Sequence, residues 1–268
     1  MKLLDGKKTS ERIRKELKPK SGLKLAVVLA GEDPSSITYV NAKKKACEDA
    51  GIGCIIVKLS GGCGEGELID KINELNENPE VTGILVQLPL PEDIDSRKVL
   101  DTVEIKKDVD GLHSYHLKQI FIGKEKVLPC TPKGVLTLLD EYKIGLKGKD
   151  VCVVGYSDVV GKPLAALCLN RSATVDVCHI DTKDLSEHAR RADIIMSAAG
   201  VPNLIRKGMV KKDAVVVDIG ITKKDGKIYG DVDFEAVKDD CSYITPVPGG
   251  VGPMTVTSLL ENMVEISR

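Results

Sequence analysis

The stretch Val151-Cys-Val-Val-Gly-Tyr-Ser-Asp-Val-Val-Gly161 decides the fold of the second half of the chain. It has the pattern of an apolar strand, a glycine turn and the start of a helix, which is how dinucleotide-binding units begin. Glycines let backbone N–H groups approach a phosphate, and the positive end of a helix favours its negative charge. Ser157 stands where the usual G-x-G-x-x-G spacing has its second glycine, so a tight turn without a ligand is the alternative.

Strand-like and helix-like segments alternate on both sides of this stretch. Apolar runs predict strands at residues 23–30, 54–59, 83–88, 151–154, 174–178, 194–198 and 214–218. Helical patterns fall between and after them, at residues 9–18, 36–50, 67–76, 95–103, 132–142, 160–169, 184–191 and 255–267. Such alternation predicts an α/β protein with parallel sheets and right-handed crossovers.

A more polar and irregular stretch, residues 106–132, separates the two alternating halves. We place a domain junction there, which gives two α/β domains. The last helix, residues 255–267, could pack on either of them.

The composition excludes several classes of protein. Apolar residues make up 42% of the 268 residues and charged ones 29%, as in soluble globular proteins. The net charge of −1 supplies no basic field, so no nucleic-acid partner is expected. No apolar run is as long as a membrane span, and residues 1–8 lack the apolar core of a signal peptide, so neither a membrane association nor a leader is expected.

The cysteines and histidines predict neither disulfides nor a metal site. No two of the eight cysteines form a C-x-x-C pair, and Cys152 and Cys178 fall in strand-like runs, where free thiols pack as small apolar groups. We therefore expect a reducing, cytoplasmic location. His113 and His116 have the i, i+3 spacing of metal ligands but no suitable third ligand, so we interpret them as surface or cleft-rim residues.

A phenol, an amine and an amide are predicted to meet in the first half. Tyr39 and Lys43 lie one helical turn apart, so both side chains reach the same point. Gln87 ends an apolar run, where open α/β sheets place their ligand sites. Such a cleft can hold and protonate a polar organic substrate. Taken singly, Lys43 could belong to a solvated lysine run at residues 43–45, and Gln87 could cap its strand.

Three later segments have features of a nucleotide site. Asp181 lies just beyond the strand at 174–178, where a carboxylate can bind a ribose diol and repel a 2′-phosphate. Its alternative role is a helix N-cap for a segment that begins near Lys183. Residues 198–202 and 218–221 end later strands with small side chains, which permits a flat ring to lie close to the backbone.

Six segments are similar to one known family. They are Tyr39-Val-Asn-Ala-Lys43, Gly83-Ile-Leu-Val-Gln-Leu-Pro-Leu-Pro91, Lys107-Asp-Val-Asp-Gly111, Pro129-Cys-Thr-Pro-Lys-Gly134, Gly155-Tyr-Ser157 and Pro246-Val-Pro-Gly-Gly-Val-Gly-Pro-Met-Thr255. From end to end the chain resembles the bifunctional methylenetetrahydrofolate dehydrogenase/cyclohydrolases. The second and the last segments are long and highly specific, which leaves little room for chance agreement.

The resemblance implies a two-step enzyme of one-carbon folate metabolism that uses NADP or NAD. Methylenetetrahydrofolate would give up a hydride to the nicotinamide, and water would open the methenyl cation to 10-formyltetrahydrofolate. Relatives are typically homodimers with a folate cleft between two α/β domains. Residues 1–118, completed by the helix 255–268, would form the folate-binding catalytic domain. Residues 119–254 would form a Rossmann-like NAD(P)-binding domain with a parallel sheet.

The resemblance also implies roles for single residues. Lys43 matches the family's catalytic lysine, which would handle protons during hydration and ring opening. Gln87 would hydrogen-bond and tune that lysine, and Tyr39 would pack on and orient the folate. The carboxylate of Asp110 would accept two N–H bonds from the pterin, although an aspartate in Asp-Val-Asp-Gly could instead serve a turn.

Two proline-containing segments are implied to add substrate contacts. Residues 248–255 would form a loop that closes over the substrate. The expected contacts on these segments are Leu88, Pro89, Pro248, Gly252 and Thr255. The bonds Leu88-Pro89 and Val247-Pro248 are candidates for the cis form, because only X–Pro bonds adopt it at low cost.

The second domain is expected to bind the cofactor, without a catalytic residue of its own for hydride transfer. The implied contacts are Gly155, Tyr156, Ser157, Ile180, Asp181 and Ile221. Relatives usually have arginine in place of Tyr156 and often serine in place of Ile180, and NADP-using members bind the 2′-phosphate with them. A phenol and an isoleucine supply no positive charge, and Asp181 would repel a phosphate. We therefore predict a weakened preference for NADP, unless Lys183 or another cation compensates.

Three other functions compete with this one, and the order of the motifs argues against the first and the presence of Lys43 against the second. A short-chain dehydrogenase also uses Tyr-x-x-x-Lys, but its glycine turn precedes that motif, whereas Gly155 follows Tyr39. A dehydrogenase without cyclohydrolase activity would not need Lys43. A non-catalytic nucleotide-sensing protein could share the scaffold, because a fold does not fix a function.

Overall fold

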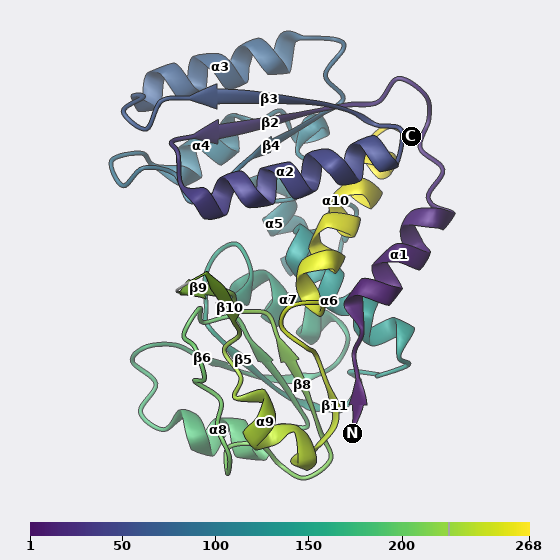
Figure 1. Cartoon of the computed structure of the whole chain (residues 1–268), viewed down its shortest axis with the longest axis vertical. Coiled ribbons are helices and arrows are strands. Elements are labelled where there is room, and N and C mark those ends of the chain that lie inside the picture. Colours follow the sequence, from purple (N-terminus) through teal and green to yellow (C-terminus); the bar gives the residue numbers. More distant parts are fainter. Residues whose placement is uncertain (225) are drawn as a thin grey trace. The chain divides into compact units, whose positions relative to one another are not determined.

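The computed structural model describes residues 1–224 and 226–268, with the main chain alone at Ser35 (Figure 1). Contacts divide the chain into two compact units. Unit 1 consists of Met1–Arg12 and Thr131–Thr255, and unit 2 of Ile13–Cys130 and Val256–Arg268. Each unit is built on a parallel sheet with helices, which confirms the predicted fold class. The predicted ligand-binding ranges, 1–118 with 255–268 and 119–254, stay a prediction.

Unit 2 is built on a three-stranded parallel sheet. Its strands are β2 (Lys24–Ala30), β3 (Gly53–Leu59) and β4 (Gly83–Val86), in the order β3-β2-β4. Central β2 is buried from its second residue to its last, as expected of an apolar strand with both faces covered. Helices α2 (Pro34–Asp49) and α3 (Glu65–Glu77) connect these strands and lie on opposite faces of the sheet (Figure 1).

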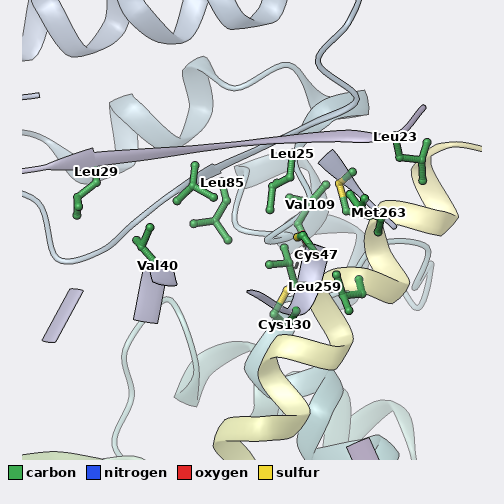
Figure 2. Close-up of a cluster of buried hydrophobic side chains, with 14 residues drawn as sticks. Leu23, Leu25, Leu29, Val40, Cys47, Leu85, Val109, Cys130, Leu259 and Met263 are labelled. Atoms are coloured by element: carbon green, nitrogen blue, oxygen red, sulfur yellow. Dashed lines mark hydrogen bonds between the residues drawn. The ribbon is translucent and has the colours of Figure 1, made fainter. Parts of the chain in front are cut away.

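The core of unit 2 brings together segments that are far apart in the sequence. Figure 2 shows Leu25 of β2 and Cys47 of α2 in one cluster with Leu259 and Met263 of the last helix. All four side chains are at most 1% exposed. The last helix, α10 (Val251–Ile266), therefore completes this core with its C-terminal half, a choice that the sequence left open.

Unit 1 contains a six-stranded parallel sheet in the order β1-β11-β8-β7-β5-β6. Its strands are β1 (Lys2–Leu3), β5 (Asp150–Val154), β6 (Thr174–Cys178), β7 (Ile194–Ser197), β8 (Ala214–Asp218) and β11 (Cys241–Ile244). Strand β5 has β6 on one side and β7 on the other, so the order of the strands reverses there. Open α/β sheets bind ligands in the crevice outside the carboxyl ends of strands at such a reversal.

The other elements complete the alternation. They are α1 (Gly6–Glu16), α4 (Ser96–Thr102), η1 (Ile105–Lys107), α5 (Ser114–Phe121), α6 (Cys130–Glu141), α7 (Gly161–Asn170), α8 (Leu185–Arg191), β9 (Thr222–Lys224), β10 (Lys227–Tyr229), α9 (Phe234–Val237) and η2 (Lys238–Asp240). The predicted strands at 174–178 and 214–218 have the bounds of β6 and β8, and the other predicted elements differ only at their ends. Of the helices in the described residues, none is both long and apolar enough to span a bilayer.

The prediction of an irregular stretch at residues 106–132 is wrong for its middle, where α5 forms. Side chains fix the start of α5. The carboxylate of Asp101 accepts hydrogen bonds from the backbone N–H and the hydroxyl of Ser114, at 2.7 and 2.6 Å. The ring of His113 accepts a further N–H bond of the first turn. These bonds satisfy N–H groups that a helix start otherwise leaves unpaired.

The predicted loop at residues 248–255 is wrong from Val251 onward, because α10 begins there. Pro253 lies in the first turn of this helix, where its missing N–H costs no intrahelical hydrogen bond. Both predicted cis bonds, Leu88-Pro89 and Val247-Pro248, are confirmed.

Candidate active site

Lys43 and Gln87 form a hydrogen-bonded pair in unit 2. Helix α2 starts at Pro34, after Asp33 accepts the N–H of Ser36 at 2.6 Å, and it carries the lysine. Lys43 Nζ donates to Gln87 Oε1 at 3.0 Å, and Gln87 Nε2 donates to the carbonyl of Leu88 at 2.6 Å. The second bond orients the amide so that its oxygen faces the amine.

This pair decides two of the alternatives that the sequence left open. Lys43 is partly buried, whereas Lys44 and Lys45 are exposed, so Lys43 is not one of a uniformly solvated run. Gln87 is buried and bonds both the backbone beyond its strand and the amine, so it does more than cap β4.

Tyr39 lies one turn before Lys43 on α2 and is 39% exposed. Partial burial raises the pKa of its phenol, which therefore stays protonated at neutral pH. A neutral phenol beside an amine offers a flat apolar ring and one O–H group to a ligand.

Lys107 fixes the end of a helix. Its buried amine donates to three carbonyl oxygens, those of Leu75, Asn76 and Asn78, at 3.1, 2.7 and 2.8 Å. These carbonyls lie at the C-terminus of α3, where a positive charge is favoured. Burial lowers the pKa of the Lys107 amine. No local pattern predicts this role, because the partners are about 30 residues away in the sequence.

The turn that follows is held by Asp108, not by Asp110. The carboxylate of Asp108 accepts the N–H groups of Asp110, Gly111 and His113 at 3.1, 3.0 and 2.8 Å. Burial raises the pKa of Asp108 to about 6, against the effect of these N–H donors, and the charge of Asp110 acts in the same direction as burial. The alternative that Asp110 serves the turn is therefore wrong. Its own carboxylate makes no hydrogen bond or ion pair with the side chains and backbone that the structure describes.

The glycine turn of unit 1 has no room for a side chain. Gly155 follows β5 with φ +101°, and a Cβ there would lie 2.4 Å from the carbonyl oxygen of Ala198, beyond β7. A Cβ on Gly161 would lie 2.0 Å from the oxygen of Gly155. Ser157 Oγ accepts the N–H of Val160 at 3.2 Å and so shapes the turn from within. This close backbone approach at the strand reversal fits a dinucleotide.

An aromatic pair stands beside this turn. The rings of Tyr156 and His179 are 4.9 Å apart, tilted by 46°, and Lys162 Nζ lies 5.1 Å from the centre of the Tyr156 ring. Lys162 also bonds Asp158 at 2.6 Å. Ile180 projects into solvent and is 94% exposed.

Asp181 also lies beyond β6, with its carboxylate 3.5 Å from His179 Nδ1 and largely exposed. The alternative that it caps a helix is wrong, because Asp184 caps α8 by accepting the N–H of Glu187 at 3.0 Å. Its carboxylate therefore remains available at the end of the strand.

The remaining predicted residues lie in two groups, one in each unit. In unit 2, Leu88 is partly buried and Pro89 exposed, next to Gln87. In unit 1, Thr255 Oγ1 lies 3.1 Å from Thr131 Oγ1. A Cβ placed on Gly252 would lie 3.9 Å from Ile221 Cδ1. Pro248 is exposed at the turn before α10.

His113 and His116 both contact backbone groups of the protein. His113 caps α5, and His116 Nε2 lies 3.1 Å from the carbonyl oxygen of Ile105. His116 is 5% exposed, so its interpretation as a surface or rim residue is wrong. Among the described residues, no group of three or more His, Cys, Asp or Glu could hold a metal ion, and the eight cysteines are free thiols.

Two family models match the chain. Residues 4–110 match the catalytic domain of tetrahydrofolate dehydrogenase/cyclohydrolase, and residues 129–268 match its NAD(P)-binding domain. The bifunctional protein FolD of Nitratiruptor sp. is 51% identical, with 100% of this chain and 98% of the relative covered.

Solved structures agree with this match. The structure of FolD from Campylobacter jejuni is 50% identical with a TM-score of 0.96, covering 100% of this chain and 98% of that one. The enzyme of Trypanosoma brucei, solved with NADP and an inhibitor, is 35% identical with a TM-score of 0.92, covering 98% and 95%. The chain belongs to the tetrahydrofolate dehydrogenase/cyclohydrolase family.

Proposed function

We propose that Lys43, held by Gln87, handles the protons of the cyclohydrolase reaction. The chain is a bifunctional methylenetetrahydrofolate dehydrogenase and methenyltetrahydrofolate cyclohydrolase. The first reaction oxidises the methylene carbon, and a nicotinamide held by the NAD(P)-binding domain would supply the hydride acceptor. In the second, water adds to the methenyl cation and the ring opens to 10-formyltetrahydrofolate, with release of one proton. The observation that carries the proposal is the 3.0 Å bond between Lys43 and Gln87.

The chemistry of hydration explains why an amine is suited to this place. Water that attacks the cationic carbon must lose a proton, and ring opening must deliver a proton to the departing nitrogen. The amine of Lys43 is placed to accept the first proton and to return it in the second step. Gln87 keeps the nitrogen in place because its oxygen can accept a bond but cannot take the proton away.

Asp110 and Tyr39 are proposed to bind the folate. The two oxygens of Asp110 can accept two N–H bonds from the edge of a pterin. The bonds of Asp108 position the Asp110 backbone, and the described part of the chain gives the Asp110 carboxylate no hydrogen bond or ion pair. Tyr39 would cover the ring with its phenol. Further contacts are proposed for Leu88, Pro89, Pro248, Gly252 and Thr255.

Replacing Gln87 by methionine tests the role of the pair. Gln87→Met keeps the length of the side chain and removes the acceptor, so we expect methenyl hydrolysis to fall about tenfold, in line with one lost hydrogen bond. Hydride transfer should stay within about twofold, because that step needs no protein base. Hydrolysis at the wild-type rate in this variant would show that Gln87 has no part in the mechanism.

The NAD(P)-binding domain is expected to prefer NADP over NAD only weakly. The proposed contacts are Gly155, Tyr156, Ser157, Ile180, Asp181 and Ile221. Neither Tyr156 nor Ile180 carries a charge, and the exposed carboxylate of Asp181 would repel a 2′-phosphate. The amine beside Tyr156, that of Lys162, has its charge partly balanced by Asp158.

The cofactor preference is measured as the ratio of kcat/KM for NADP⁺ and NAD⁺ in methylenetetrahydrofolate oxidation. We expect a ratio within about tenfold of one for the wild type, and a rise of about tenfold in Tyr156→Arg, which adds a charged phosphate ligand. A wild-type ratio in the hundreds or more would contradict the predicted weak preference. Lys162→Met then shows whether its amine is the compensating cation.

We further propose that the protein works as a homodimer in the cytoplasm. The resemblance to homodimeric relatives supports the first proposal, and the eight free thiols support a reducing compartment. Sedimentation equilibrium of the purified chain gives its molar mass: about twice 28.9 kDa supports the dimer and 28.9 kDa contradicts it.

A further inference from the structure

We propose that Asp231 is a positioning residue for the nicotinamide cofactor, acting through the loop Ala199–Gly200–Val201 that follows β7. The proposal rests on the cofactor use described above and adds a residue to it. Asp231 lies in unit 1 and is 0% exposed, so it does not present its carboxylate to solvent.

The contacts of Asp231 fix three consecutive peptide groups. Its Oδ2 accepts the N–H of Ala199 at 2.7 Å and that of Gly200 at 3.2 Å, and its Oδ1 accepts the N–H of Val201 at 2.9 Å. The hydroxyl of Ser197 donates to Oδ2 at 2.9 Å. A fully buried carboxylate is tolerated only when such donors surround it, so charge and loop shape depend on each other.

A second carboxylate holds Asp231 itself. Asp218, at the end of β8, accepts the N–H of Asp231 at 2.9 Å and that of Val232 at 3.0 Å. Burial raises the pKa of Asp218 to about 7. Glycines provide the space: a Cβ on Gly220 would lie 2.0 Å from Asp231 Oδ1, and one on Gly230 would lie 1.9 Å from Asp218 Oδ2. The Asp231 carboxylate is therefore held in one position, in close contact with the backbone of neighbouring segments.

The loop that Asp231 holds belongs to the cofactor crevice. It begins after Ala198, whose carbonyl oxygen is the atom that leaves Gly155 no room for a Cβ. Strands β5 and β7, which each end one residue before these two, are the pair at which the strand order reverses. Since cofactors of open sheets bind outside the carboxyl ends at the reversal, the loop lines the site while Asp231 lies behind it.

Asparagine at this position would keep the size of the side chain and lose one of its two acceptor oxygens. One of its two terminal atoms is an NH₂ group, which would face backbone N–H donors in place of an acceptor. At least one peptide group of the loop would then lose its partner, and the loop would no longer keep one conformation.

The test compares Asp231→Asn with Asp233→Asn. Asp233 is two residues further on and caps α9 by accepting the N–H of Ala236 at 3.3 Å. For each protein, the Kd of the nicotinamide dinucleotide is measured by direct titration, together with KM for cofactor, kcat at saturating cofactor, and the cofactor-independent hydrolysis of methenyltetrahydrofolate. Ser197→Ala, which removes one donor and keeps the carboxylate, is the milder variant.

We expect Asp231→Asn to raise the Kd and KM of the cofactor about tenfold, as loss of one bond to a buried charge would. Its kcat at saturation and its hydrolysis rate should stay within about threefold of wild type, a split that general loss of folded protein does not produce. Ser197→Ala should raise the Kd about threefold and Asp233→Asn should leave it unchanged, within the range of neutral substitutions.

Three results would overturn the positioning role. The first is an unchanged Kd in Asp231→Asn, and the second is a parallel loss of cofactor binding and hydrolysis, which would make Asp231 a residue of fold stability alone. If Asp231→Asn does not accumulate as folded protein, Ser197→Ala decides, and an unchanged Kd there is the third. A wild-type protein that binds neither NAD⁺ nor NADP⁺ refutes the cofactor function itself.

Discussion

Asp108 and Asp110 are two residues apart and have opposite surroundings. Asp108 is buried and saturated by three backbone N–H groups, whereas the carboxylate of Asp110 has no partner among the described residues. Resemblance alone pointed to Asp110, and the sequence did not reveal that its neighbour holds the turn. Which of two nearby aspartates becomes buried depends on tertiary packing, not on local pattern.

Substitution of each aspartate by asparagine separates binding from stability. Asp110→Asn offers one acceptor oxygen in place of two, so we expect KM for the folate to rise about tenfold. The free energy of unfolding should change by less than about 0.5 kcal/mol, because no internal bond is lost. Asp108→Asn should lower that free energy by about 1–3 kcal/mol, since one backbone N–H loses its acceptor. Urea unfolding measures the free energy, and steady-state kinetics measure KM for the folate. An unchanged KM in Asp110→Asn would contradict the role of Asp110 in folate binding.

Among the elements, helix α3 shows how a distant charge ends a helix. Asn78, its C-terminal flanking residue, is in the extended region, and the amine of Lys107 bonds three carbonyls there. A cation at the negative end of a helix satisfies acceptors that have no intrahelical donor. Lys107 thereby connects η1 to α3 and steadies the segment that carries Asp108 and Asp110.

Removing this amine should destabilise unit 2. Lys107→Met keeps the aliphatic stem but leaves the three carbonyls without their donor, so we expect a loss of about 1–3 kcal/mol in the free energy of unfolding. Lys106→Met is the matched control, because Lys106 is an exposed neighbour that pairs with Glu104 at the surface, and it should cost less than about 0.5 kcal/mol. Equal urea midpoints for the two variants would contradict the capping role.

Long elements with regular patterns were the predictable ones. The apolar run at residues 23–30 became central β2, and the spacing of Tyr39 and Lys43 on α2 follows from helical geometry. The strands β1, β9, β10 and β11 and the helix α9 have no counterpart in the prediction, because two to four residues carry no periodicity. Helix α5 depends on bonds from Asp101, which only the folded chain brings close.

At the scale of the whole molecule, the residues proposed to act on the folate and the glycine turn proposed for the cofactor belong to different units. Tyr39, Lys43, Gln87 and Asp110 belong to unit 2, and the glycine turn at Gly155 belongs to unit 1. The match of both family models along the chain explains why resemblance predicted the activity, whereas composition excluded only whole classes of protein. The role of Asp231 could not be predicted from the sequence, because its four hydrogen-bond donors come from residues 197–201, about 30 positions away.

The rate of methenyltetrahydrofolate hydrolysis in Lys43→Met, corrected for the reaction in buffer, tests the central claim most directly. We predict a fall of at least about a hundredfold, the usual loss when a general acid–base group is removed, with methylenetetrahydrofolate oxidation retained within a few-fold. Lys44→Met, at the exposed neighbouring lysine, should keep both activities. Hydrolysis by Lys43→Met at the wild-type rate would contradict the assignment of proton transfer to this amine.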